Sequence, residues 1–290
     1  GVCVCCIIAV GVLYLFASRS LPDYDGEVAL SGITAPVDII RDNANVPHIV
    51  GTNDEDVFVG LGYAHAQDRL WQLITMRRTV QGRLSEVFGH DTLPIDRVLR
   101  RLDLYTLATQ SVSAQTPETL AALEAYSAGI NARLSQINAD ALGRGAPELF
   151  LFSNQIAPWQ PADSIALMKL MALQGTTHLE QEVLRARTSL VLPNERMLDL
   201  LPDTPGEGLA DLPSFAEVMP QGSTHIYAAS SQELRHPLSP FRPRDLAGAS
   251  NAWAAAPSRS ATGGSLLASD PHLAFSSPSI WYLARLELAS

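Results

Sequence analysis

The chain has 290 residues, of which 20 are Lys or Arg and 30 are Asp or Glu, so its formal net charge is −10. This acidic balance argues against a nucleic-acid-binding protein, which would present basic residues to the phosphates. Hydrophobic residues make up 47% and charged residues 17%, which supports a sizeable core and excludes a disordered chain. Since the chain starts at Gly1 and stops inside an apolar run, we expect it to be a piece of a longer protein.

The first 18 residues, 1–18, are apolar and contain no charge and no proline. This length reaches the threshold of about 18 residues for a membrane-spanning helix, whereas a secretory signal usually has an apolar core of about 7–15 residues. We therefore predict a transmembrane anchor, with a signal segment as the alternative. All the cysteines, Cys3, Cys5 and Cys6, lie here, which favours acylated or inert membrane cysteines over a redox pair or a zinc site. With a cysteine-free body behind it, this segment predicts a periplasmic location or one on the outer face of the cytoplasmic membrane.

The next region, residues 19–200, is predicted to be mostly helical after a linker and a β-hairpin. Alternating apolar and polar residues indicate the two strands. Asn53 and the acids after it mark the start of the longest helix, which Gly82 and Gly89 are expected to break. The expected elements are, in chain order, strands over residues 36–41 and 46–50 and helices over residues 53–88, 116–138 and 161–192.

Residues 201–249 are predicted to be a spacer. Pro, Gly and Ser punctuate this segment and the helical periodicity is lost. A loop longer than about 15 residues inside a compact domain is usually functional or disordered. From Ser250 onward the pattern changes to β, with strands expected over residues 251–257, 265–269 and 280–288.

Common catalytic motifs are absent from the chain. It contains no G-x-S-x-G, no Walker loop, no H-E-x-x-H and no G-x-G-x-x-G. A conventional serine-hydrolase elbow and a nucleotide-dependent enzyme are therefore not indicated.

Two separated blocks carry a family resemblance. The first comprises Val37-Asp-Ile-Ile-Arg-Asp42, Gly60-Leu-Gly-Tyr-Ala-His-Ala-Gln-Asp-Arg-Leu-Trp-Gln72 and Gly82-Arg-Leu-Ser-Glu-Val-Phe-Gly89. The second comprises Gly248-Ala-Ser-Asn-Ala-Trp253 and Asp270-Pro-His-Leu273. In the order and spacing of these blocks, the chain from about residue 25 to its end resembles the penicillin acylase (penicillin amidase) family of N-terminal nucleophile hydrolases.

The resemblance implies an α+β fold, in which a helical α chain packs on a four-layer αββα core and residues 250–290 supply only its first strands. It also implies a precursor that cuts itself between Ala249 and Ser250 and yields an α/β heterodimer. The chemistry suits this position, because a serine hydroxyl needs a base. The freed α-amino group, with a reference pKa near about 8, can accept that proton. Ser250 would then be both nucleophile and base.

His272 follows Ser250 by 22 residues, and the resemblance places it beside the nucleophile. There it would orient the amine or the serine, or lie near the developing oxyanion. The alternative is a turn histidine that packs locally after Pro271. Relatives with histidine at this position resemble cephalosporin acylases and N-acyl-homoserine lactone acylases. Asn251 is assigned to the site only as the neighbour of Ser250.

The resemblance further implies one calcium ion, with Glu182 as its ligand from the α chain. Ca²⁺ takes six to eight oxygens, so this carboxylate is at best one ligand. The alternative is a solvated helix face on which Glu182 pairs with nearby arginines. Met168 and Met171 are assigned to the acyl pocket on the same resemblance, with ordinary core packing as the alternative.

The polar run His65, Gln67, Asp68 and Arg69 invites assignment as a proton relay. We prefer a structural interpretation, in which Asp68 and Arg69, with Arg77 and Arg78, form ion pairs that hold the helix, because buried charges persist only when paired.

These observations predict a self-processing amidohydrolase that acts on a small-molecule N-acyl amide, such as a penicillin or an N-acyl-homoserine lactone, through an acyl-enzyme at Ser250. Two alternatives remain: a membrane-anchored, non-catalytic binding protein of the same fold, and a peptide or lipopeptide acylase. The oxyanion-hole donors and most calcium ligands are expected beyond Ser290, so this piece alone should be inactive. No organic cofactor is expected.

Overall fold

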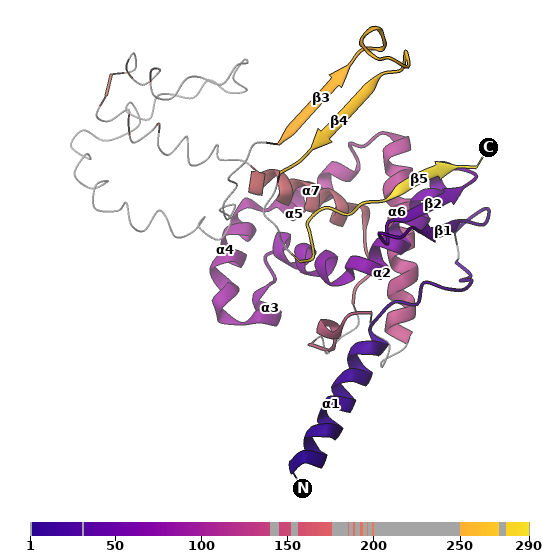
Figure 1. Cartoon of the computed structure of the whole chain (residues 1–290). Coiled ribbons are helices and arrows are strands. Elements are labelled where there is room, and N and C mark those ends of the chain that lie inside the picture. The colour runs from indigo at the N-terminus through magenta and orange to yellow at the C-terminus, as the bar shows by residue number, and fades with distance from the viewer. Residues whose placement is uncertain are drawn as a thin grey trace. The chain divides into compact units, whose positions relative to one another are not determined.

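The computed structural model describes residues 2–30, 32–139, 145–151, 156–175, 250–272 and 277–289, and the single positions 185, 188, 192, 193, 196 and 199. The chain divides into two compact units: Gly1–Leu170 together with Arg244–Ser290, and Met171–Pro243. Nearly all the described elements belong to the first unit (Figure 1). The predicted spacer, residues 201–249, lies outside the described residues.

Helix α1 (Val2–Arg19) contains the apolar N-terminal residues. Its large side chains are exposed, with Ile7 at 71% and Leu13 at 70%. Among the residues that the structure describes, no helix is both long and apolar enough to cross a membrane. The predicted transmembrane anchor is therefore not supported.

The predicted hairpin is confirmed. Strands β1 (Asp38–Arg41) and β2 (Pro47–Gly51) pair antiparallel, with Ile39 opposite Ile49, around a turn in which Asn45 has a positive φ of 60°. A third strand, β5 (Arg285–Leu288), pairs parallel with β2 and completes the sheet in the order β1-β2-β5. A segment beyond Ser250 is thereby joined to the start of the chain (Figure 1).

The long helix α2 (Asp54–Val80) begins where the sequence predicts. The side chain of its N-cap, Asn53, accepts a hydrogen bond from the Asp56 amide at 2.8 Å. The helix ends before Gly82, whose φ of 62° suits glycine, and a short helix α3 (Ser85–Phe88) follows. Inside α2 the residue Arg69 leaves helical geometry (φ −132°, ψ 17°), so the helix is kinked there.

After α3 the described residues form η1 (His90–Thr92), α4 (Leu93–Leu102), α5 (Leu104–Val112), α6 (Pro117–Ala139), η2 (Pro147–Leu151) and α7 (Pro161–Gly175). Helix α6 agrees with the predicted helix over residues 116–138. Helix α7 begins at the predicted residue, and the rest of the predicted helix, beyond residue 175, lies outside the continuously described residues. Helices α4 and α5 were not predicted from the sequence.

The core forms where α2 packs on α6. At their crossing, a Cβ atom on Gly62 would overlap the carbonyl oxygen of Tyr126, and one on Gly129 would overlap that of Val59, so the backbones touch. Buried apolar side chains from both helices and from the residues before α7 fill the adjoining space, among them Leu70, Leu73, Ile74, Ile130, Leu134, Leu149 and Trp159.

The chain from Ser250 onward begins with a separate hairpin. Strands β3 (Asn251–Ala255) and β4 (Leu266–Asp270) pair antiparallel across a loop that contains η5 (Pro257–Arg259). These strands agree with the predicted ones over residues 251–257 and 265–269. Helices combined with two small sheets confirm the predicted α+β class.

Candidate functional site

The β3–β4 hairpin brings Ser250 and His272 together. In its register Asn251 lies opposite Asp270, so the residue before β3 meets the residues after β4. The backbone N–H of His272 donates a hydrogen bond to Ser250 Oγ at 3.1 Å. Ser250 is exposed, and so is Asn251, the other neighbouring residue assigned to the site. The hydroxyl is thus accessible and held by one backbone donor.

The imidazole of His272 contacts Asp270. Its Nε2 donates to Asp270 Oδ2 at 2.7 Å, and the two side chains are 44% and 71% exposed. An exposed pair of this kind contributes little stability, but it fixes which ring nitrogen carries the proton. Asp270 was not assigned a role from the sequence, although its position two residues before His272 offered a signal.

The other predicted site residues are not gathered around Ser250 by the described structure. Ala249 and Glu182 lie outside the described residues. Met168 is 69% exposed on α7, and Met171 belongs to the second compact unit. Among the described residues, no group of three His, Cys, Asp or Glu side chains could hold a metal ion.

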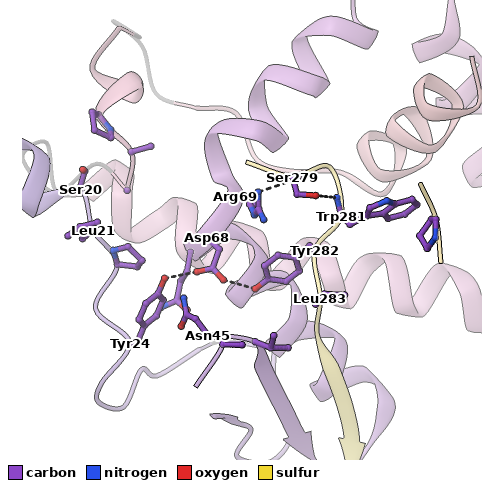
Figure 2. A pocket seen from close by; sticks show the side chains of 18 residues that line it. Ser20, Leu21, Tyr24, Asn45, Asp68, Arg69, Ser279, Trp281, Tyr282 and Leu283 are labelled. Carbon is purple, nitrogen blue, oxygen red and sulfur yellow. Dashed lines mark hydrogen bonds between the residues drawn. The ribbon is translucent and has the colours of Figure 1, made fainter. Parts of the chain in front are cut away.

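A second polar cluster surrounds Asp68 in α2. Its carboxylate accepts hydrogen bonds from Tyr24 Oη at 2.8 Å and Tyr282 Oη at 2.7 Å, and a bidentate pair from Arg41 at 2.8 and 3.1 Å. Figure 2 shows the two tyrosines on either side of this carboxylate. We define Asp68, Arg41, Tyr24 and Tyr282 as the Asp68 cluster.

The structure shows the partners of the charged residues that were expected to form ion pairs. Asp68 pairs with Arg41 of β1 and not with its neighbour Arg69. Arg77 pairs with Asp163 at 3.3 Å, and Arg78 pairs with Glu86 at 2.9 Å. The interpretation that ion pairs hold this helix is therefore confirmed for Asp68, Arg77 and Arg78. Their partners lie in β1, α7 and α3, respectively.

His65 lies beside the cluster. Its ring stacks on Tyr282 with centroids 4.5 Å apart, and its Nδ1 is 2.6 Å from Tyr126 Oη. Burial, aided by the positive charge of Arg69, lowers the pKa of His65 to about 4. Burial also raises the pKa of Tyr126 and of Tyr282. At neutral pH these three side chains are therefore uncharged.

A cavity of about 740 Å³ adjoins the cluster. Tyr24 and Asp68 line it from the first part of the chain, and Ser279 and Tyr282 line it from the part after Ser250 (Figure 2). Pro271 also lines it. Pro271 directly precedes His272, whose amide reaches Ser250 Oγ. The cavity therefore has walls from both sides of the predicted cut.

Comparison with known proteins assigns the class. The family model described as penicillin amidase matches residues 36–290, so the chain belongs to the penicillin amidase family.

Curated relatives are consistent with this family. Penicillin acylase 2 proenzyme of Pseudomonas sp. (strain SE83) is 32% identical over 280 residues, covering 90% of this chain and 33% of that protein. Acyl-homoserine lactone acylase QuiP of Pseudomonas fluorescens (strain Pf0-1) is also 32% identical over 280 residues, covering 93% of this chain and 33% of the relative. The chain thus spans about a third of the length of these relatives. A solved structure of thermostable penicillin G acylase from Alcaligenes faecalis matches with a TM-score of 0.46 and 23% identity, covering 61% of this chain and 98% of that one.

Proposed function

We propose that the full-length protein is a self-processing amidohydrolase whose nucleophile is Ser250. Family membership supports amide hydrolysis, and the observation that carries the assignment of Ser250 is the hydrogen bond from the His272 amide to its accessible Oγ. The first relatives named above are a penicillin acylase and an acyl-homoserine lactone acylase. The proposed substrate class is accordingly a small N-acyl amide.

Processing would begin at the peptide bond between Ala249 and Ser250. Ser250 Oγ attacks the carbonyl carbon of Ala249, and the peptide nitrogen leaves with the hydroxyl proton to become the α-amino group of Ser250. Water then hydrolyses the resulting ester and releases the Ala249 carboxylate. The cut yields two chains that form the proposed α/β heterodimer.

Catalysis would reuse the same oxygen. The Ser250 hydroxyl proton passes to the new α-amino group while Oγ attacks the substrate carbonyl carbon. The leaving amine takes that proton, and water hydrolyses the acyl-enzyme to the free acid. The His272 N–H, which donates to Oγ at 3.1 Å, would hold that oxygen in position for the attack. Asp270 would hold the imidazole of His272 through its 2.7 Å contact.

Calcium, a periplasmic location and the roles of Glu182, Met168 and Met171 belong to the same proposal as features of the family pattern. The described residues do not by themselves make a metal site, and one carboxylate from Glu182 would be at best one of six to eight oxygen ligands. No step above depends on the ion.

Intact mass and N-terminal sequencing of the full-length gene product test the proposal. We expect the parent to show a new terminus reading Ser-Asn-Ala-Trp, and the Ser250→Ala variant to stay uncut and inactive toward N-acyl anilides. Ser258→Ala, which removes an exposed serine from the loop of the same hairpin, is the matched control and should be cut like the parent. A parent that stays uncut would refute the hydrolase and favour the non-catalytic binding protein of the same fold.

A further inference from the structure

The Asp68 cluster joins parts of the chain that lie on opposite sides of the proposed cut. Asp68 precedes Tyr282 by 214 residues, and their hydrogen bond is 2.7 Å long. Asp68, Arg41 and Tyr24 precede Ser250, whereas Tyr282 follows it. Once the bond before Ser250 is broken, this contact would be held between two chains.

The hydrogen bonds of the Asp68 cluster are strong because they involve the Asp68–Arg41 ion pair. The side chains of Asp68 and Arg41 are only 12% and 9% exposed, and they form a bidentate ion pair. Hydrogen bonds to a charged acceptor are about twice as strong as neutral ones. The phenol of Tyr282 donates to the same carboxylate that Arg41 pairs with, so the ion pair and the tyrosine share one acceptor.

Neighbouring contacts hold the same segment, residues 279–283. Arg69 Nη1 and Gln72 Nε2 donate to the backbone carbonyl of Ser279 at 3.1 and 3.3 Å. His65 stacks on Tyr282. The kink at Arg69 lies between Asp68 and Gln72, which also reach this segment. Backbone and side chain of the segment are therefore both fixed to α2.

We infer that Asp68 is a positioning residue for the Ser250 site, acting through Tyr282. This inference rests on the proposed function. Ser279 and Tyr282 line the same cavity as Pro271, and Pro271 carries the next residue, His272, whose amide contacts Ser250 Oγ. Anchoring residues 279–283 on α2 would fix their part of the cavity lining and thereby the position of the donor to Oγ.

Two tyrosine-to-phenylalanine variants of the full-length protein separate positioning from general stability. Tyr282→Phe and Tyr24→Phe each remove one hydroxyl that donates a hydrogen bond to Asp68, and both keep the aromatic ring. In the parent these hydrogen bonds are 2.7 Å long for Tyr282 and 2.8 Å long for Tyr24. Only Tyr282 lies after the cut. We expect Tyr282→Phe to slow the appearance of the Ser-Asn-Ala-Trp terminus about tenfold, as the loss of one charged hydrogen bond would do. Tyr24→Phe should stay within about twofold of the parent, by the same measure of rate.

The cut enzymes give a second measurement. With phenylacetyl and decanoyl para-nitroanilides as probes, kcat should fall in Tyr282→Phe by a similar factor while KM changes little, because the anchor acts on the nucleophile. Gln72→Ala, which removes a donor to Ser279, should show a smaller loss in the same direction, and it decides the question if Tyr282→Phe does not fold. Equal rates in both tyrosine variants, or no change in Gln72→Ala, would overturn the inference while the parent is still cut. A parent that is never cut would instead overturn the proposed function.

Discussion

At the scale of single residues, burial sets the charge of His65. Its pKa is lowered to about 4, first by burial and then by Arg69. Below a pH of about 6.5 the unfolded chain takes up a proton on this imidazole, and the folded chain does not until the pH nears about 4. The unfolded state therefore binds more protons in this window. The free energy of unfolding should fall as the pH drops through it, by roughly 3 kcal/mol in all.

Thermal midpoints of the full-length protein, measured across this pH window, check the expectation. His65→Phe retains a flat ring against Tyr282 but cannot titrate, so its midpoint should depend less on pH than the parent's. His90→Gln, at an exposed histidine, should keep the parent's dependence. If His65→Phe and the parent show the same dependence, another group is responsible.

At the scale of elements, the sequence predicts what neighbouring residues determine. The β1–β2 hairpin, the start of α2 at its Asn53 cap and the β3–β4 pair all follow from local alternation, caps and turns. Helices α4 and α5 were missed because they are short, and a tight turn with Asp103 at φ 50° separates them. Their attachment depends on distant groups, such as the hydrogen bond from Tyr105 Oη to Asp163 Oδ1 at 2.8 Å.

The α2–α6 crossing permits a prediction at this scale. Alanine normally favours a helix over glycine by about 1 kcal/mol. At Gly129 the added methyl group would overlap the backbone of α2, and overpacking of this kind costs about 1–3 kcal/mol or more. Gly129→Ala should therefore lower the thermal midpoint. Gly11→Ala, in α1 with open space around it, is the matched control and should not lower it. A Gly129→Ala midpoint equal to the parent's would show that the helices can move apart at no cost.

At the scale of the whole molecule, the candidate site depends on contacts that no local pattern contains. The family resemblance placed His272 beside Ser250, and the β3–β4 hairpin brings the two residues together. The partners of Asp68 could not be foreseen, since Tyr282 lies 214 residues away and Arg41 is on a different element. Residues 280–288 were expected to form a strand, but the pairing of β5 with β2 depends on the fold and not on either strand's own pattern.

This pairing predicts how the two chains behave after the proposed cut. Strand β5 adds to β2 with Leu286 beside Ile49, and the Ala289 amide donates to the Gly51 carbonyl at 2.7 Å. Backbone hydrogen bonds and apolar contacts resist salt, which screens only charges. The cut chains should therefore elute together in size-exclusion chromatography even at about 1 M salt, where the Debye length is only about 3 Å.

Urea should separate the chains, and one backbone donor should influence the concentration required. Ala289→Pro removes the N–H that bonds Gly51, at an expected cost of about 1 kcal/mol, so the chains should part at a lower urea concentration. Ala289→Ser keeps the N–H and should behave like the parent. If the proline and serine variants part at the same concentration, β5 does not hold the two chains together, and other contacts across the cut, such as the Asp68 cluster, must do so.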